Sequence, residues 1–356
     1  MIGGTVRQCV VRVADPAIAS RIVAGRSSLG WLLRELSRFG VTGALLLGDP
    51  APADLGAPLP RPVRVAVSGR SGGVGIRGAL HDARDQLQDR FLLCDGGIAF
   101  DWNLASLLAD AAGDGPEVIG RIACRDDSTG LGIGVFRKVL MEHLRPVCGR
   151  EADGLCGLAA ESLLRTTTIG GEAAPALRPD GMPEMTGLRR KALFLDRDGV
   201  LNIDHGYVGS RDRFEWVDGA LDAIRHATQA GWHVFIVTNQ SGVARGLYTE
   251  DAVRDLLAWI AGQARAAGGT IDDARFCPFH PDATVDAYRQ VHPWRKPLPG
   301  MLLDLIRTWE LDPTRAIMIG DQQTDMRAAA AAGVAGHLFG GGNLLAFLRP
   351  ILDGRA

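Results

Sequence analysis

Short apolar runs alternate along the second half of the chain with stretches in which apolar residues recur at helical spacing. The apolar runs are residues 192–195, 233–237, 275–277 and 316–319, and each is followed by a helical pattern. Runs that are this short and continuously apolar are typical of strands buried on both faces of a sheet. Strands that take turns with helices predict an open, mainly parallel sheet.

The first half of the chain shows the same alternation. Apolar runs at residues 9–13, 41–47, 63–67 and 91–93 predict strands, and patterns at 29–39 and 78–87 predict helices. Between about residues 170 and 190 the alternation stops in a stretch rich in glycine and proline, which is typical of a linker. We therefore predict two α/β domains, residues 1–185 and 188–356, each with an open, mainly parallel sheet.

Composition fits a globular chain that acts on small molecules. The chain has 356 residues, which is long for one core, and 46% of them are apolar against 22% charged. The formal net charge of -2 provides no basic surface, so neither nucleic acid nor a membrane is expected as a partner. The six cysteines form no Cys-x-x-Cys pair, and from the sequence pattern we expect neither a leader peptide nor a membrane-spanning run. We expect a cytoplasmic protein with reduced thiols.

Two carboxylates follow the strand predicted at residues 192–195. Asp196 and Asp198 start on one face because side chains alternate along a strand, and Gly199 lets the chain turn away beyond them. Further polar residues that follow the later strands are Thr238, Lys296, Asp321 and Asp325. Ligands of open α/β sheets bind at the carboxyl ends of the strands, so we expect these side chains to share one site.

This series of segments resembles the haloacid dehalogenase superfamily of phosphatases, and the resemblance covers about residues 188–352. It implies that Asp196 is the nucleophile that carries an aspartyl-phosphate, and that Asp198 is the general acid and base. A carboxylate that forms a mixed anhydride divides a difficult hydrolysis into two easier steps. A second carboxyl group can protonate the leaving oxygen and then activate water.

The resemblance also implies a magnesium site, because two acids and a phosphate would otherwise repel each other. Asp321 would hold Mg²⁺ together with the Asp196 carboxylate and the backbone carbonyl of Asp198. Asp325 would orient metal-bound water or Lys296. Thr238 offers a hydroxyl to a phosphoryl oxygen, and Lys296 offsets the negative charge that builds up in the transition state.

Closer motifs at residues 202–208, 238–246, 277–281 and 295–300 resemble the histidinol-phosphate and heptose-bisphosphate phosphatase group. This resemblance implies a sugar phosphate as substrate, with the 7-phosphate of a D-glycero-D-manno-heptose 1,7-bisphosphate favoured over histidinol phosphate. About forty residues separate Asp198 from Thr238, which leaves no room for a large cap domain. Asn239, Arg245 and Arg295 are the candidate substrate-binding residues, the two arginines for a second phosphate.

The same group commonly carries a zinc loop with four Cys and His ligands, and this chain departs from that pattern. Cys277 and His292 match two ligand positions, whereas Phe279 and Trp294 occupy the other two. His280 could shift in as a third ligand, but a closed structural zinc site needs four. We therefore expect a metal-free loop packed by aromatic residues.

Segments of the first half resemble sugar-1-phosphate nucleotidyltransferases over about residues 8–184. The phosphate-binding loop of that family is rich in glycine, but residues 13–19 here contain none and include Pro16. Gly97 stands where the family places a metal-binding Asp. We predict a degenerate transferase domain retained for scaffolding, homodimer contacts or substrate delivery. A bifunctional transferase and phosphatase, and a regulator that only binds phospho-sugars, remain open alternatives.

Overall fold

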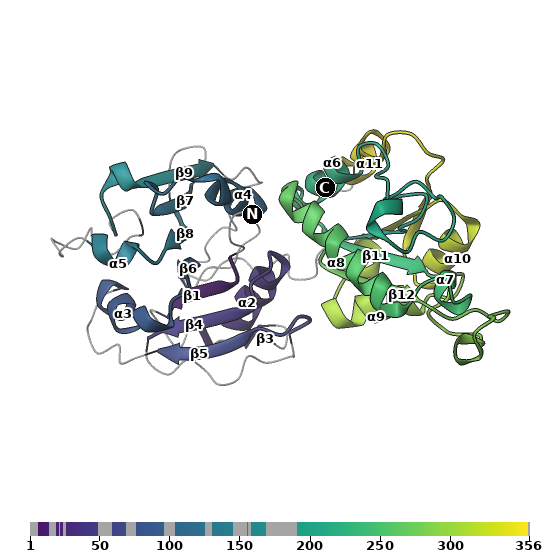
Figure 1. The fold of residues 1–356 in the computed structure, drawn as a ribbon, viewed down its shortest axis with the longest axis horizontal. Helices are drawn as coiled ribbons and strands as arrows, with labels where there is room; N and C mark the ends of the chain where they lie inside the picture. The colour runs from purple at the N-terminus through teal and green to yellow at the C-terminus, as the bar shows by residue number, and fades with distance from the viewer. Residues whose placement is uncertain are drawn as a thin grey trace. The chain divides into compact units, whose positions relative to one another are not determined.

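The structure is a computed structural model, and the chain divides in it into two compact units, Met1–Thr186 and Gly187–Ala356. It describes residues 6–13, 19–20, 22–23, 26–48, 59–68, 76–95, 104–124, 130–144, 155, 158–168 and 191–354. None of the described helices combines the length and the apolar character that crossing a membrane requires. Each unit is built around its own sheet (Figure 1).

The first unit contains a seven-stranded sheet in the order β5-β4-β1-β6-β8-β7-β9. Its strands are β1 (Gln8–Arg12), β4 (Gly43–Leu47), β5 (Arg64–Ser68), β6 (Arg90–Asp95), β7 (Gly120–Cys124), β8 (Gly130–Arg137) and β9 (Leu164–Thr168). Strand β8 runs antiparallel to both of its neighbours, and the other four pairings are parallel. Strands β2 (Ile22–Val23) and β3 (Arg26–Ser27) form a separate antiparallel pair.

Helices cover both faces of this first sheet. They are α2 (Ser28–Arg38), α3 (Ile76–Asp82), α4 (Ala105–Gly113) and α5 (Leu140–His143). Helix α2 begins at Ser27, whose hydroxyl accepts a hydrogen bond from the Gly30 amide and so caps the first turn. Alternate residues of β1 enter two separate hydrophobic cores, Val11 with α2 and α4 and Val10 with α3 and α5.

The second unit contains a five-stranded sheet in the order β12-β11-β10-β13-β14, in which every pairing is parallel. Its strands are β10 (Ala192–Leu195), β11 (His233–Asn239), β12 (Asp273–Cys277), β13 (Ala316–Gly320) and β14 (Ala335–Leu338). Every residue of β10 and β13 is buried, as expected for central strands covered on both faces.

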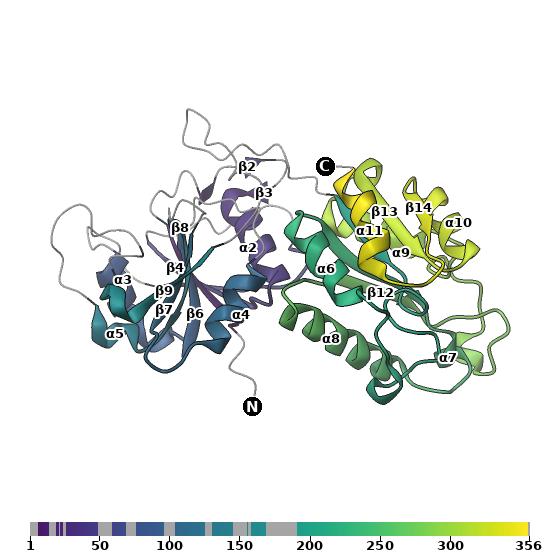
Figure 2. The same cartoon turned by 90° about the horizontal axis from the view of Figure 1, so that it is seen from above.

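Helices form one layer on each face of the second sheet (Figure 2). They are α6 (Ala220–Gln229), α7 (Ser241–Ala244), α8 (Glu250–Ala266), α9 (Gly300–Trp309), α10 (Gln323–Ala331) and α11 (Leu344–Asp353). Leu193 and Leu195 of β10 pack with α6, α8 and α11, which enclose one core. Phe194 points to the opposite face and packs with α9 and α10. The strand ends are therefore fixed by two cores.

The predicted fold class of two open, mainly parallel sheets is confirmed. The helix predicted at residues 78–87 is wrong at its end, because α3 stops at Asp82 and a short 3₁₀ turn, Arg84–Gln86, follows. Sequence patterns also missed β7, β8, β9 and β14, which are short or rich in glycine and polar residues. The predicted linker, residues 14–18 of the expected phosphate loop, and Gly97 lie outside the described residues.

Candidate active site

A cavity of about 430 Å³ opens at the carboxyl ends of β10, β11 and β13. It is lined by Asp196, Asp198, Asp204, Gly206, Tyr207, Thr238, Asn239, Ser241, Tyr248, Lys296, Asp321, Gln322, Thr324 and Asp325. The sheet brings these residues together because the ends of parallel strands meet at one edge. The cavity therefore contains all six residues that were predicted for catalysis and metal binding.

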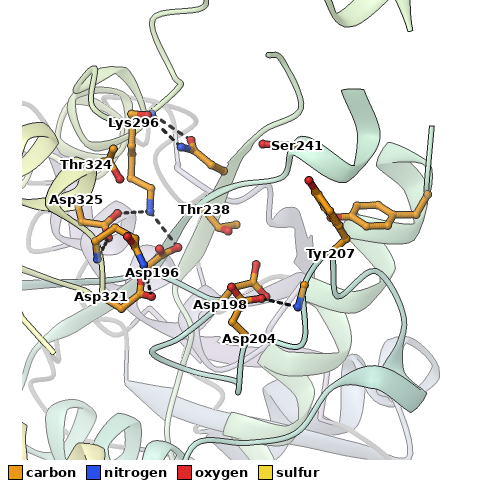
Figure 3. A pocket seen from close by; sticks show the side chains of 14 residues that line it. Asp196, Asp198, Asp204, Tyr207, Thr238, Ser241, Lys296, Asp321, Thr324 and Asp325 are labelled. Atoms are coloured by element: carbon orange, nitrogen blue, oxygen red, sulfur yellow. Dashed lines mark hydrogen bonds and ion pairs between the residues drawn. The ribbon is translucent and has the colours of Figure 1, made fainter. Parts of the chain in front are cut away.

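Lys296 lies between two carboxylates inside this cavity (Figure 3). Its Nζ is 2.9 Å from Asp196 Oδ1 and 2.6 Å from Asp325 Oδ1, and it also donates a hydrogen bond to the carbonyl of Val237 at 2.9 Å. Only 3% of Lys296 is exposed, so solvent screens these ion pairs weakly. The ammonium group is held by three oxygens from three separate segments.

Asp196 has one oxygen in use and one without a hydrogen bond from any described residue. Its Oδ1 accepts the Arg197 amide at 2.7 Å as well as the Lys296 ammonium. Among the described residues no hydrogen bond falls on Oδ2, and Asp196 lines the cavity. An oxygen that is free of hydrogen bonds is the one available for nucleophilic attack.

Asp321 lies beside Gly199, where any side chain at residue 199 would require Asp321 to move. A Cβ atom at residue 199 would lie 2.4 Å from Asp321 Oδ2, and Gly199 has a φ of +80°. Asp321 Oδ2 accepts the Gln322 side-chain amide at 2.9 Å. Asp321 Oδ1 is buried and accepts no hydrogen bond from any described residue. A buried oxygen in this condition is costly unless another ligand satisfies it.

Three carboxylates could together hold a metal ion. Asp196, Asp321 and Asp325 each offer an oxygen within 4.8 Å of the others. Hard cations such as Mg²⁺ prefer oxygen ligands of this kind, and the buried Oδ1 of Asp321 fits such an ion. Both oxygens of Asp325 already have partners. Its Oδ2 accepts a hydrogen bond from the Gln322 backbone N–H at the start of α10, and its Oδ1 is paired with the Lys296 ammonium.

Burial is the largest single influence on the pKa values of Asp196, Asp321 and Lys296. It raises the pKa of Asp196 to about 7, although Lys296 acts in the opposite direction. It also raises the pKa of Asp321. For Lys296, burial lowers the pKa, but the charges of Asp196 and Asp325 outweigh burial and the net shift is upward. The lysine is therefore kept as a cation.

Asp198 is surrounded by donors. The Arg197 guanidinium, which is fully buried, donates to both of its oxygens at 2.8 Å. Asn202 donates to Oδ1 at 3.1 Å and Gln240 donates to Oδ2 at 3.0 Å. Asp198 is thus held in one orientation at the edge of the cavity.

Asn239, predicted as a substrate-binding residue, holds Lys296 in place. Its side-chain amide donates to the Lys296 carbonyl at 3.1 Å and accepts from the Lys296 amide at 3.1 Å. Such a two-point contact fixes the backbone from which the lysine side chain extends. Asn239 still lines the cavity, but both ends of its amide are engaged.

Arg245 and Arg295 lie beside the cavity and not among the residues that line it. The Arg295 guanidinium donates to Ser241 Oγ at 3.1 Å and to the Phe279 carbonyl at 3.2 Å. Burial lowers the pKa of Arg295, and the nearby charge of Arg245 lowers it further. The Arg245 guanidinium lies 5.7 Å from the centre of the Tyr207 ring, a cation–π distance. These contacts create a positive region next to the cavity.

Several lining residues were missed by the sequence reasoning. Asp204 and Tyr207 come from the loop after β10, and Tyr207 has a φ of +53°, which is uncommon for a tyrosine. Arg213 donates to the carbonyls of His205, Gly206 and Tyr207 and so holds this loop. The missed lining residues Ser241, Tyr248, Gln322 and Thr324 follow β11 and β13. For Ser241, Gln322 and Thr324, the position close after a predicted strand was the available signal, whereas helix α7 separates Tyr248 from β11.

The loop after β12 is packed by aromatic rings. The His292 ring stacks on Phe279 with centroids 4.5 Å apart, and its Nδ1 accepts the Trp294 amide. His280 Nδ1 accepts the Asp282 amide, and Cys277 is buried with its Sγ 3.9 Å from the Phe279 carbonyl. One nitrogen of each imidazole is therefore used within the loop.

Comparisons with known proteins find a matching family model and several similar chains. A family model for HAD-hydrolase-like proteins matches residues 293–345. A D-glycero-beta-D-manno-heptose-1,7-bisphosphate 7-phosphatase from Rhodopseudomonas palustris is 51% identical over 164 residues, which span 46% of this chain and 91% of the relative.

Two solved structures are also similar to this chain. D,D-heptose 1,7-bisphosphate phosphatase from B. bronchiseptica, complexed with magnesium and phosphate, is 37% identical; the match covers 45% of this chain and 86% of that one, with a TM-score of 0.39. The inositol-1-phosphate CTP transferase from T. maritima is 14% identical; the match covers 39% of this chain and 74% of that one, with a TM-score of 0.32.

Proposed function

We propose that the second unit of this chain, which belongs to the haloacid dehalogenase-like phosphatases, hydrolyses a sugar phosphate with Mg²⁺ as cofactor. The chain is a phosphoric monoester hydrolase. The substrate that we favour is a D-glycero-D-manno-heptose 1,7-bisphosphate, from which the 7-phosphate is removed. The 51% identity to a relative of that name, over 91% of its length, supports this choice.

One observation carries the proposed mechanism: Lys296 holds one oxygen of Asp196, a residue that lines the cavity, and no described residue donates to the other. Oδ2 of Asp196 would attack phosphorus while the bond from phosphorus to the sugar oxygen breaks, which yields an aspartyl-phosphate. Lys296 stays close to the charge that develops, and burial strengthens its effect. The Thr238 hydroxyl, at the end of β11, would donate to a phosphoryl oxygen.

Asp198 would serve both chemical steps. In the first step it would give a proton to the leaving sugar oxygen. In the second it would take a proton from water, which attacks the aspartyl-phosphate and releases inorganic phosphate and free Asp196. Arg197 and Gln240 both donate to Asp198 and hold its carboxyl group in one orientation for both steps.

Mg²⁺ would be held by Asp196, Asp321 and the backbone carbonyl of Asp198, with Asp325 as a further carboxylate. When bound, it supplies positive charge that lets anionic phosphate approach a carboxylate nucleophile. The buried Oδ1 of Asp321, which has no described hydrogen-bond donor, is the feature of this chain that suits a cation.

The positive region beside the cavity supports a substrate with two phosphates. Burial lowers the pKa of His280, and the charges of Arg295 and Arg245 lower it further, so these three groups lie close together. An anion would relieve the repulsion between the two arginines, and a guanidinium can bind phosphate by two hydrogen bonds. Asp204 and Tyr207 would face the sugar between the two phosphates.

A substrate panel tests the proposal. We expect the purified chain, with Mg²⁺, to release phosphate from heptose 1,7-bisphosphate at a kcat/KM at least about 10-fold above that for histidinol phosphate or heptose 7-phosphate. Phosphorus NMR of the product would show a remaining 1-phosphate. Preference for histidinol phosphate, or release of the 1-phosphate, would contradict the substrate assignment.

The role of the first unit needs a separate assay. We propose that it has lost transferase activity, in keeping with the missing glycines of residues 13–19. Incubation with heptose 1-phosphate and ATP, CTP or GTP should then give no pyrophosphate, whereas pyrophosphate release would identify a bifunctional enzyme.

A further inference from the structure

Tyr248 lies in a slot beside the candidate site that two glycines shape. It lines the cavity just before helix α8. A Cβ atom at Gly209 or at Gly242 would lie 2.2 Å from a carbon of its ring. Contacts that close do not occur, so both positions need glycine for the tyrosine to occupy this place. The ring is fixed by backbone on two sides.

The hydroxyl of Tyr248 donates a hydrogen bond to Gln240. The distance from the Tyr248 oxygen to Gln240 Oε1 is 2.9 Å, and only 1% of Gln240 is exposed. Burial raises the pKa of Tyr248, so its hydroxyl keeps its proton. A buried amide oxygen that accepts one defined donor has a fixed orientation.

The other end of the Gln240 amide faces two residues of the proposed mechanism. Its Nε2 donates to Asp198 Oδ2 at 3.0 Å and to Thr238 Oγ1 at 2.8 Å. The amide orientation follows from these partners, because a carboxylate accepts hydrogen bonds only and so requires the nitrogen. The oxygen must then point to Tyr248, whose hydroxyl is a donor.

This orientation determines what Thr238 can do with its own proton. A threonine hydroxyl carries one proton, and here its oxygen already accepts from Gln240. The proton of Thr238 is therefore not used in that contact and can be donated into the cavity, which Thr238 lines (Figure 3). If the amide were reversed, Thr238 would donate to Gln240 and lose this capacity.

We propose that Tyr248 is a positioning residue that acts through the Gln240 amide to keep the Thr238 hydroxyl directed at the phosphoryl group. The inference rests on the proposed function, because it takes Thr238 and Asp198 as reacting-site residues. Tyr248 also keeps a donor on Asp198, since the same amide nitrogen serves both. The chain from Tyr248 to Gln240 to Thr238 contains only buried or partly buried groups.

The first test replaces Tyr248 by phenylalanine, which keeps the ring in its slot and removes only the hydroxyl. We expect kcat to fall about 10-fold, with KM changed less than about twofold, because an interaction used in the transition state is lost. Tyr288→Phe is the matched control: the Tyr288 hydroxyl donates to Glu250 at 3.1 Å, and Tyr288 is not among the lining residues. Its kinetics should match the wild type.

A double-mutant cycle asks whether Tyr248 acts through Gln240. Gln240→Met removes the amide at similar volume and should lower kcat by itself. Adding Tyr248→Phe to that variant should then have no further effect, because two residues that act in series are not additive. A further loss of about 10-fold in the double variant would overturn the proposal, since Tyr248 would act by another route.

An NMR readout separates this inference from the proposed function. The side-chain amide signals of Gln240, assigned by their absence in Gln240→Met, should shift in Tyr248→Phe and stay unchanged in Tyr288→Phe. Unchanged Gln240 signals, unchanged kcat, or a change confined to KM would each overturn the inference. If the wild type released no phosphate from any phosphomonoester, the proposed function would fail, and the Gln240 signals would still decide the orientation of the amide.

Discussion

At the scale of single residues, the candidate site depends on one buried cation among several acids. Lys296 is nearly inaccessible, yet it contacts Asp196 and Asp325 and a backbone carbonyl. Three carboxylates this close would repel each other without such a charge. A compact ammonium group can serve several acceptors at once, whereas the planar fork of arginine suits one carboxylate at a time. The chemistry of the lysine thus matches its surroundings.

Replacement of Asp196 by asparagine is the direct test of the nucleophile. The change keeps the shape of the side chain and removes the attacking oxygen, so kcat should fall by at least about 1,000-fold. The melting temperature should stay within a few degrees of the wild type. Asp251→Asn, at a surface position of α8, is the control and should keep full activity. Near-normal turnover in Asp196→Asn would contradict the assignment.

Magnesium binding should depend on pH because protons and the cation compete for Asp196. Burial raises its pKa to about 7, and only the ionised form binds a cation. Below about pH 7 the apparent Kd for Mg²⁺ should therefore rise up to about 10-fold per pH unit, and above it the Kd should level off. Titration calorimetry from pH 5.5 to 8.5 measures this. A Kd that does not change across pH 7 would contradict it.

At the scale of elements, the loop after β10 depends on a short 3₁₀ turn, Arg211–Arg213. Arg213 donates to three successive carbonyls, those of His205, Gly206 and Tyr207. These contacts hold a loop whose Tyr207 has a positive φ and whose Asp204 lines the cavity. In a site without a large cap, such loops are the elements that can contact the sugar. The 3₁₀ turn thereby positions groups that it does not contain.

Arg213→Ala should loosen this loop without changing the chemical step. KM for heptose 1,7-bisphosphate should rise about 5-fold or more, whereas kcat/KM for p-nitrophenyl phosphate, which has no sugar, should stay within about twofold. Arg211→Ala removes an arginine from the same 3₁₀ turn and serves as the control. Equal losses on both substrates would mean that Arg213 supports the whole unit and not the loop alone.

At the scale of the whole molecule, each unit has its own sheet and its own cores. The buried clusters of the second unit contain only residues from Ala192 onward, and those of the first unit only residues up to Leu164. All residues that line the candidate cavity belong to the second unit. A unit that buries its own apolar surface is expected to fold independently.

Residues 187–356 expressed alone should therefore fold and act as a phosphatase. We expect a cooperative thermal transition and a kcat/KM within about threefold of the full chain, measured by phosphate release with Mg²⁺. The same fragment with Asp196→Asn controls for contaminating phosphatases. An insoluble or inactive fragment would show that the first unit supports the second.

The family and the fold class could be predicted from sequence because both depend on local patterns. Buried parallel strands are continuous apolar runs, and polar residues directly after them must lie at one sheet edge. This reasoning located Asp196, Thr238 and Asp321, and the matching relative confirms the resemblance to the phosphatase family. Glycine-rich and polar strands such as β8 and β9 were missed because they lack an apolar run.

What the sequence determined by itself is which side chains reach the sheet edge and the class of chemistry that they support. Only the tertiary structure decided how they are paired: Lys296 with Asp196 and Asp325, Asn239 with the lysine backbone, and Tyr248 with Gln240. The physical reason is distance along the chain. Periodicity and spacing report on neighbours within a turn or a strand, whereas these contacts join segments that only the packing of two helical layers on one sheet brings within hydrogen-bond distance.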